Sequence, residues 1–171
     1  MFRKTLIALP ALALGLALAP GAHAQTTEDR LDIVELTARL DTSVDAKQWD
    51  TARALFVDTI EVEMGGPAET MPADELIASW SRNLYEGKPS FHLRGNHIID
   101  FSSPTRAVVR SKGYAWNRVN AGLPDGDLWE VWGDYTFDVR KVDGEWMLGS
   151  FVFALRNSRG NGNVPGYVPE Q

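Results

Sequence analysis

The chain has 171 residues, of which 44% are hydrophobic and 23% charged, a composition typical of a globular protein rather than a disordered or collagen-like one. Its formal net charge is −6 and the sequence has no marked basic cluster, which argues against nucleic-acid partners and stable membrane attachment. The absence of cysteine excludes disulfides, thiolate nucleophiles, cysteine-ligated zinc and lipid attachment at an N-terminal cysteine.

The first 24 residues have the pattern of a secretory signal peptide. Arg3 and Lys4 precede an apolar run over residues 6–19, and an A-x-A cleavage sequence follows at residues 22–24. The apolar run is too short to span a membrane. Cleavage would leave 147 residues, enough for one core, and would remove two of the 17 basic residues, so that 15 oppose 23 acidic ones with a net charge of −8. We therefore expect a periplasmic or secreted protein.

The residues after the signal peptide predict three helices. Thr26 and Asp29 have the spacing of a capping box, and apolar residues recur every three or four positions, which predicts a helix over about 28–46. A second, short helix is expected at about 49–57. Pro72, followed by two acidic residues, opens a third helix, whose inward-facing residues are Leu76, Ile77, Trp80 and Leu84.

The other elements are predicted strands. Residues 60–64 alternate between apolar and charged, with Ile60, Val62 and Met64 on one face, and a Gly-Gly-Pro sequence ends this strand. Alternation then predicts four longer strands, at residues 91–101, 106–117, 128–141 and 145–155. Because their connections are short, consecutive strands should be antiparallel neighbours. Helices followed by such a sheet indicate one α+β domain, over residues 25–156. Residues 157–171, rich in Gly, Asn and Pro, are expected to form a tail that is ordered at first and then frays.

His92 and His97 are the histidines that remain after cleavage. Their five-residue separation puts them on opposite faces of a regular strand, so we expect no metal site, and no pattern indicates a cofactor. Asp45 lies at the edge of the apolar stripe of the first helix, where a carboxylate needs a partner. A histidine on the covering sheet would provide one, and the pairing would give the imidazole the fixed tautomer and basicity that a general base needs.

Several short motifs resemble those of the SnoaL-like members of the nuclear transport factor 2 superfamily. They are Asp45-x-x-x-Trp49-Asp50, His92-x-x-x-Asn96 and Gly133-x-Tyr135-x-x-x-x-Arg140-x-x-x-Gly144-x-Trp146, within a resemblance that spans residues 28–155. The resemblance implies a cone, in which a curved antiparallel sheet wraps around three N-terminal helices and a pocket opens between the helices and the concave face. It also implies a cofactor-independent lyase or isomerase of small hydrophobic molecules.

The resemblance assigns roles to particular residues. Scytalone dehydratase and hexachlorocyclohexane dehydrochlorinase use an Asp/His pair, which falls on Asp45 and His92 here. Val44 and Met64 stand where scytalone dehydratase has two substrate-polarising tyrosines, and Asn117 stands near its second pocket histidine. Ketosteroid isomerase takes its base from the strand that here ends in Met64, where no carboxylate is present. The pair is therefore retained while the substrate-specific groups are not.

The orientation of His92 conflicts with strict alternation. Phe91, Leu93, Ile99 and Phe101 form an apolar, odd-numbered face that reads as core, so a regular strand would turn His92 to solvent. A bulge at Gly95 would invert the face between His92 and the later residues, and a concave face that is partly polar around a pocket would also resolve the conflict. We predict that His92 faces the helices, within hydrogen-bonding distance of Asp45.

Further candidate ligand-binding residues are Tyr135, Asn96, Trp80 and Trp129. The Tyr135 hydroxyl could polarise a carbonyl or hold a water, or the ring could be a plain core aromatic. Asn96 is expected to form an internal hydrogen bond unless it lines the pocket. The two indoles would suit a planar apolar ligand but also fit in the core or at the pocket rim. Arg94 could neutralise an acidic substrate, although a solvated sheet face accounts for it.

These observations predict an exported lyase or isomerase that acts by dehydration or by a double-bond shift beside a carbonyl. His92 would be its general base or acid, and Asp45 the orienting carboxylate. The alternative is a non-catalytic periplasmic ligand-binding or accessory domain of the same fold, and a polyketide cyclase-like role follows only from the superfamily name. The expected partner is a small hydrophobic molecule. The resemblance also implies a homodimer through the convex sheet face, with exposed aromatic side chains there as its sign.

Overall fold

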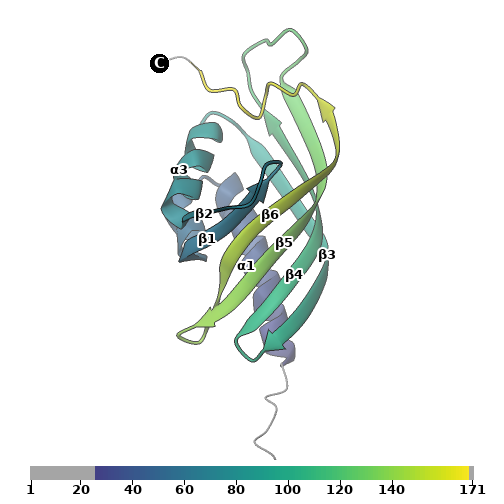
Figure 1. The fold of residues 1–171 in the computed structure, drawn as a ribbon. Helices are drawn as coiled ribbons and strands as arrows, with labels where there is room; N and C mark the ends of the chain where they lie inside the picture. Colours follow the sequence, from purple (N-terminus) through teal and green to yellow (C-terminus); the bar gives the residue numbers. More distant parts are fainter. Residues whose placement is uncertain (1–25, 170–171) are drawn as a thin grey trace, which may run out of the picture.

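The computed structural model describes residues 26–169, so the predicted signal peptide lies outside the described residues. The elements are α1 (Thr27–Asp45), α2 (Trp49–Ala54), β1 (Phe56–Met64), β2 (Glu69–Pro72), α3 (Ala73–Asn83), β3 (Ser90–Ser103), β4 (Arg106–Arg118), β5 (Leu128–Val142) and β6 (Glu145–Gly160). The strands form one curved sheet in the order β2-β1-β6-β5-β4-β3, and the helices cover its inner face (Figure 1). The predicted α+β class is confirmed. Among residues 26–169, no helix is long and apolar enough to cross a membrane.

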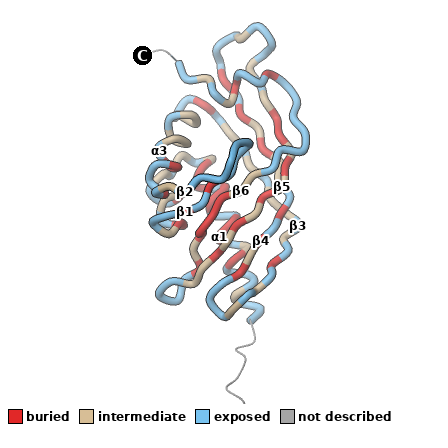
Figure 2. Tube along the Cα trace, in the orientation of Figure 1, coloured by how far each residue is buried: buried red, intermediate tan, exposed pale blue. Residues whose placement is uncertain are grey.

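The core lies between α1 and the long strands. Ile33 and Leu40 of α1 belong to the same buried apolar cluster as Phe137 of β5 and Leu148 of β6, and all four side chains are fully buried. Buried residues recur along β5 and β6 in Figure 2. Burial of each such side chain contributes about 1.5–3 kcal/mol. The predicted capping box is present at the start of α1, where Thr26 and Asp29 bond to each other's backbone N–H groups. The apolar core fixes the position of α1 on the sheet, and the capping box stabilises the first turn of the helix.

One edge of the sheet differs from the prediction. The helix expected at 49–57 ends at Ala54, because Phe56 already begins β1. β1 runs parallel to β6 rather than antiparallel, and it also pairs with β2, a short strand that the sequence did not predict. Phe56 and Ile60 are buried but are four residues apart, a spacing that also fits a helix, so periodicity alone could not separate the two structures.

The C-terminal segment is more ordered than the sequence suggests. β6 continues to Gly160, so the expected tail contributes its first residues to the sheet. Asn161 and Val164 are buried, and the fully buried Lys88 donates from Nζ to the backbone carbonyls of Pro165 at 2.9 Å and Tyr167 at 3.1 Å. We call residues 161–169 the C-terminal strap, since this contact ties them to the turn before β3.

A bulge in β3 resolves the conflict over His92. The pairing of β3 with β4 shifts register between Gly95 and Ile98, and Asn96 has a φ of 55°. His92, before the bulge, and His97, after it, therefore both contact α1, so the prediction of opposite faces is wrong. Phe91 and Leu93, expected in the core, lie on the outer face with 42% and 60% of their surface exposed, whereas Ile99 is buried.

Candidate active site

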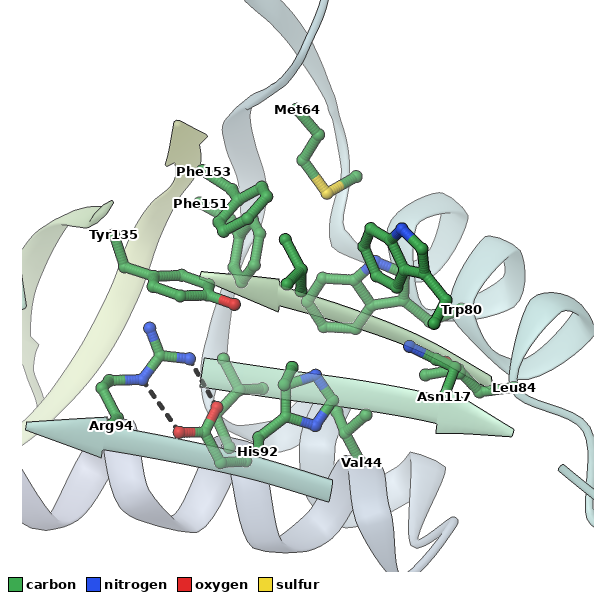
Figure 3. A pocket seen from close by; sticks show the side chains of 15 residues that line it. Val44, Met64, Trp80, Leu84, His92, Arg94, Asn117, Tyr135, Phe151 and Phe153 are labelled. Atoms are coloured by element: carbon green, nitrogen blue, oxygen red, sulfur yellow. Dashed lines mark hydrogen bonds and ion pairs between the residues drawn. The ribbon is translucent and has the colours of Figure 1, made fainter. Parts of the chain in front are cut away.

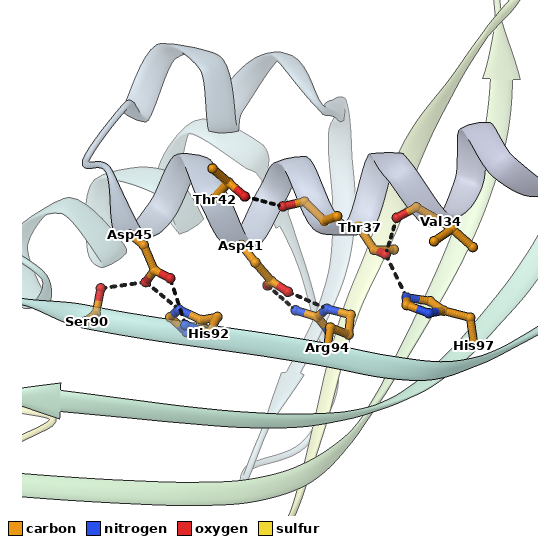
Figure 4. A network of polar contacts seen from close by, with 10 residues as sticks. Val34, Thr37, Asp41, Thr42, Asp45, Ser90, His92, Arg94 and His97 are labelled. Carbon is orange, nitrogen blue, oxygen red and sulfur yellow. Dashed lines mark hydrogen bonds and ion pairs between the residues drawn. The ribbon is translucent and has the colours of Figure 1, made fainter.

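A polar row runs between α1 and β3 (Figure 4). Residues four positions apart on a helix share a face, and three such residues of α1 each meet a side chain of β3: Thr37 bonds His97, Asp41 bonds Arg94 and Asp45 bonds His92. The matching order along the two elements follows from their antiparallel course and from the β3 bulge. α1 is thus joined to the sheet by ion pairs and hydrogen bonds as well as by its apolar stripe.

The Asp45 carboxylate accepts three hydrogen bonds. Its Oδ2 accepts from the backbone N–H of His92 at 2.7 Å, and its Oδ1 accepts from His92 Nδ1 at 2.7 Å and from the Ser90 hydroxyl at 2.8 Å. The Ser90 hydroxyl accepts in turn from Lys47 Nζ at 2.9 Å. Burial alone would raise the pKa of Asp45, but the hydrogen bonds and charge of His92 and the bond from Ser90 outweigh it and hold that pKa below its usual value.

This bonding fixes the tautomer of His92. An ionised carboxylate can only accept, so Nδ1 of His92 must carry the hydrogen that points to Asp45. Within residues 26–169, no side chain bonds the other ring nitrogen, Nε2, and His92 lines a cavity on its far side from Asp45. A neutral imidazole held in this way offers Nε2 as a proton acceptor.

The cavity has a volume of about 160 Å³ and lies between α1, α3 and the inner face of the sheet (Figure 3). Its polar lining residues are Asp41, His92, Arg94, Asn117 and Tyr135. The rest of the lining is apolar and comes from Leu40, Val44, Met64, Trp80, Leu84, Ala115, Trp129, Val131, Phe151 and Phe153. Among the described residues, no group of three or more His, Asp or Glu side chains could hold a metal ion.

The structure brings most of the predicted site residues to this cavity. The predicted residues that line it are His92, Tyr135, Asn117, Met64, Trp80, Trp129 and Val44. Asp45 does not line the cavity but accepts a hydrogen bond from Nδ1 of His92. Asn96 does not reach it: the bulge turns this residue outward, where it is exposed on the outer face, so its prediction as a ligand-binding residue is wrong.

The buried pair of Asp41 and Arg94 was missed at the sequence level. The Arg94 side chain is only 4% exposed, so the solvated sheet face expected for it is wrong. It donates from Nε to Asp41 Oδ2 at 2.9 Å and from Nη2 to Asp41 Oδ1, and its guanidinium carbon lies 3.8 Å from the ring centre of Tyr135. The spacing carried a signal, because Asp41 precedes Asp45 by one helical turn and Arg94 follows His92 by one strand repeat.

Tyr135 occupies space that Gly113 leaves free, and Phe153 occupies space that Gly133 leaves free. Gly113 of β4 and Gly133 of β5 are register partners, and a Cβ on Gly113 would lie 2.3 Å from the Tyr135 ring. The hydroxyl of Tyr135 points into the cavity in Figure 3. Burial raises the pKa of Tyr135 to about 12, with the nearby charge of Arg94 acting in the opposite direction. The hydroxyl therefore stays protonated near neutral pH and can donate a hydrogen bond.

The SnoaL-like domain model matches residues 25–152 of the sequence, which is most of its length. The chain belongs to the SnoaL-like family. The structure also has the cone of the nuclear transport factor 2-like superfamily, to which this family belongs. No curated protein matches the sequence of this SnoaL-like protein.

Solved structures resemble the SnoaL-like chain in fold. The Kfla4162 protein from Kribbella flavida has a TM-score of 0.74 and 23% identity, over 81% of this chain and 97% of that one. A Novosphingobium aromaticivorans protein with a provisional scytalone dehydratase assignment has a TM-score of 0.70 and 24% identity, over 78% and 88%. A hexachlorocyclohexane dehydrochlorinase, LinA type 2, has a TM-score of 0.67 and 16% identity, over 83% and 94%. At these identities the likeness establishes the fold.

Proposed function

We propose that this SnoaL-like protein is a cofactor-independent lyase or isomerase that transfers a proton on a small hydrophobic molecule, by dehydration or by a double-bond shift. The observation that carries the proposal is the His92 imidazole, bound through Nδ1 to the Asp45 carboxylate and lining an apolar cavity. The dehydratase and dehydrochlorinase names among the fold relatives agree with this class of reaction.

His92 Nε2 is the proposed proton acceptor. As it takes a proton from carbon, the imidazole becomes positively charged, and the ionised Asp45 at 2.7 Å stabilises that charge. The same imidazolium then returns the proton, either to a leaving hydroxyl group or to another carbon of the substrate. The Tyr135 hydroxyl and the Asn117 amide, both in the lining, are the proposed polar contacts. The apolar walls exclude water and so strengthen these interactions.

The size of the cavity limits the substrate. Its volume of about 160 Å³ is close to that of an apolar protein cavity of about 150 Å³ that binds benzene. We therefore propose that the part of the substrate enclosed at His92 is about one six-membered ring in size. A larger molecule would extend toward Met64, a lining residue with 46% of its surface exposed.

A panel of hydroxy ketones and enones of this size tests the proposal. We expect His92→Ala and Asp45→Asn to lower turnover of the best substrate, by at least about 100-fold for His92→Ala. His97→Ala is the matched control, because His97 contacts α1 through Thr37 but does not line the cavity. Circular dichroism monitors folding of all three variants. Ligand binding without turnover by the wild-type protein would favour a non-catalytic binding domain instead.

We also propose export and self-association. Export is inferred from residues 1–24 of the sequence, and N-terminal sequencing of periplasmic protein should find Gln25 as the first residue.

Self-association is inferred from an apolar patch on the outer face of the sheet that contains Phe91, Leu93, Tyr114 and Trp116. Light scattering should give twice the mass of the mature chain, and a monomer at all concentrations would exclude the dimer.

A further inference from the structure

We propose that Arg94 is the residue that binds a carbonyl oxygen of the substrate, through its Nη1 group. This inference rests on the proposed proton transfer at His92 and adds to it the chemical class of the substrate and the group that receives its negative charge. The enclosed part of the substrate would then be an apolar ring bearing a ketone, with the acidic C–H next to the carbonyl.

The first observation is an unused donor. Arg94 donates hydrogen bonds from Nε and Nη2 to Asp41, so Nη1 is the guanidinium nitrogen that does not bond Asp41. Among the described residues, Nη1 is buried and has no hydrogen-bond partner. Buried nitrogen donors almost always have a partner, because an unpaired one costs free energy. A donor without a partner at the edge of a cavity is therefore suited to bind an acceptor atom of a ligand.

The second observation is that this donor cannot turn away. Asp41 accepts hydrogen bonds from one edge of the guanidinium. The ring centres of Tyr135 and Phe137 lie 3.8 Å and 4.9 Å from its central carbon. Asp41 also balances the charge of Arg94, so the pair is close to neutral before a ligand binds. The group is thus preorganised, and an interaction with developing negative charge requires no rearrangement.

The third observation is its position relative to the base. Arg94 and His92 are two residues apart on β3, so their side chains leave the same face of the strand about 6.6 Å apart. Both line the cavity, and in Figure 3 the free nitrogen of Arg94 lies on the side away from Asp41, toward Tyr135. The Arg94 guanidinium and the Tyr135 hydroxyl therefore lie on one side of the cavity, and His92 lines the same cavity from the same strand as Arg94.

His92, Arg94 and Tyr135 are sufficient for a complete proton-transfer reaction on a ketone. His92 Nε2 takes the proton from the carbon next to the carbonyl, and the electron pair of the broken C–H bond forms the C=C bond of an enolate. The carbonyl π electrons move to the oxygen, where the N–H of Arg94 and the O–H of Tyr135 stabilise the oxyanion. The enolate then re-forms the carbonyl by expelling a β-hydroxyl, which leaves as water with the proton from His92. In a β,γ-unsaturated ketone the dienolate instead accepts that proton at the γ carbon, and the C=C bond shifts into conjugation with the carbonyl.

A pair of ligands that differ only at the oxygen tests the assignment. Acetophenone carries the carbonyl, and α-methylstyrene has the same planar shape with a CH₂ group in its place. We expect the wild-type protein to bind acetophenone at least about tenfold more tightly in NMR titrations, since a hydrogen bond to a charged group is lost with α-methylstyrene. We also expect the ¹³C signal of the bound carbonyl to move downfield. Equal affinities, or no binding of acetophenone, would overturn the proposal.

A double variant that removes both members of the buried Asp41–Arg94 pair tests the role of Arg94 directly. Asp41→Leu together with Arg94→Met replaces them with apolar side chains, a change that buried ion pairs often tolerate. It should lower the preference for acetophenone over α-methylstyrene at least about tenfold, to what the Tyr135 hydroxyl alone provides. The control is Arg159→Met, which removes a guanidinium that pairs with Glu130 outside the cavity lining. If the double variant does not fold, Tyr135→Phe decides the question, because the preference for acetophenone and the downfield ¹³C shift should persist without the Tyr135 hydroxyl, and their loss would reject the role of Arg94.

Failure of this inference and failure of the proposed function give different results. His92→Ala should retain the preference for acetophenone while losing turnover. Turnover that depends on His92 without any preference for the ketone would reject the role of Arg94 alone. A preference for the ketone without turnover dependent on His92 would reject the proton-transfer function and leave Arg94 as a specificity residue of a binding protein.

Discussion

Asp45 and His92 lie forty-seven positions apart in the sequence but share two hydrogen bonds of 2.7 Å. The resemblance to SnoaL-like proteins was sufficient to predict this contact, although strict alternation along β3 argued against it. Arg94 was misread for the same reason, since its pattern is that of a solvent-facing residue unless the bulge is taken into account. Because Asp41 lies one helical turn before Asp45 on the same face of α1, its position would have identified the Asp41–Arg94 pair as well.

The pKa of Asp45 makes the stability of this contact depend on pH. Burial would raise that pKa, but the bonds from His92 and Ser90 lower it below the value of the unfolded chain. A carboxyl with a lowered folded-state pKa contributes stability above its unfolded pKa and loses that contribution as pH falls through the folded one. We expect Asp45→Asn to lower the free energy of unfolding by about 1–3 kcal/mol near neutral pH and by less at a pH below 3.8, the pKa of the carboxyl in the unfolded chain. Urea unfolding checks this, and an equal loss at both pH values would contradict it.

Strand β3 and its neighbours show how elements build the pocket. Gly95 was the sequence signal for the bulge, and the register of β3 shifts immediately after it. No comparable signal in the sequence marks β2. The parallel pairing of β1 with β6 has none either, because that contact joins segments about ninety residues apart. Long-range pairing depends on which edge the curved sheet leaves open, which a local pattern does not encode.

Gly113 of β4 provides a test of how the strands shape the pocket. A Cβ on Gly113 would lie 2.3 Å from the ring of Tyr135, which cannot give way easily because it packs on Arg94 and Phe153. We expect Gly113→Ala to destabilise the protein by about 1–3 kcal/mol and to weaken ligand binding by displacing Tyr135. Thermal unfolding and ligand titration measure the two effects. Gly95→Ala is the control, since a Cβ there meets nothing within 4 Å, and a similar loss in both variants would show that overpacking is not the cause.

For the whole molecule, the C-terminal strap closes the fold at the end where β3 begins. Its anchor is Lys88, whose side chain is fully buried and donates to two carbonyls of the strap. The composition of residues 157–171 suggested a tail that is ordered at first and then frays, and it could not reveal the contacts of Lys88 and Asn161 that hold this segment. The predicted order of two helices, an early strand, a third helix and four long strands is that of the structure, apart from β2 and the parallel pairing of β1 with β6.

Lys88 predicts how stability changes at alkaline pH. Burial, with a smaller effect of the charge of Lys47, lowers its pKa from 10.5 to about 8 in the folded protein. Between these values the unfolded chain binds more protons than the folded one, so this group makes the protein more stable as pH rises. The stability of the wild-type protein relative to Lys88→Met should therefore increase from about pH 8 to about pH 10.5. Urea unfolding across this range measures the difference, and a constant or falling difference would contradict the assignment.

The central claim is that His92 Nε2 moves a proton between solvent and a carbon atom of a ligand in the cavity. Incorporation of solvent deuterium next to the carbonyl of an enone or hydroxy ketone that binds the protein, followed by ¹H NMR, tests this most directly. Wild-type protein should catalyse the incorporation, and His92→Ala should slow it by at least about 100-fold while still binding the compound. Incorporation at the same rate by both proteins, or none by wild-type protein with its ligands bound, would contradict the claim.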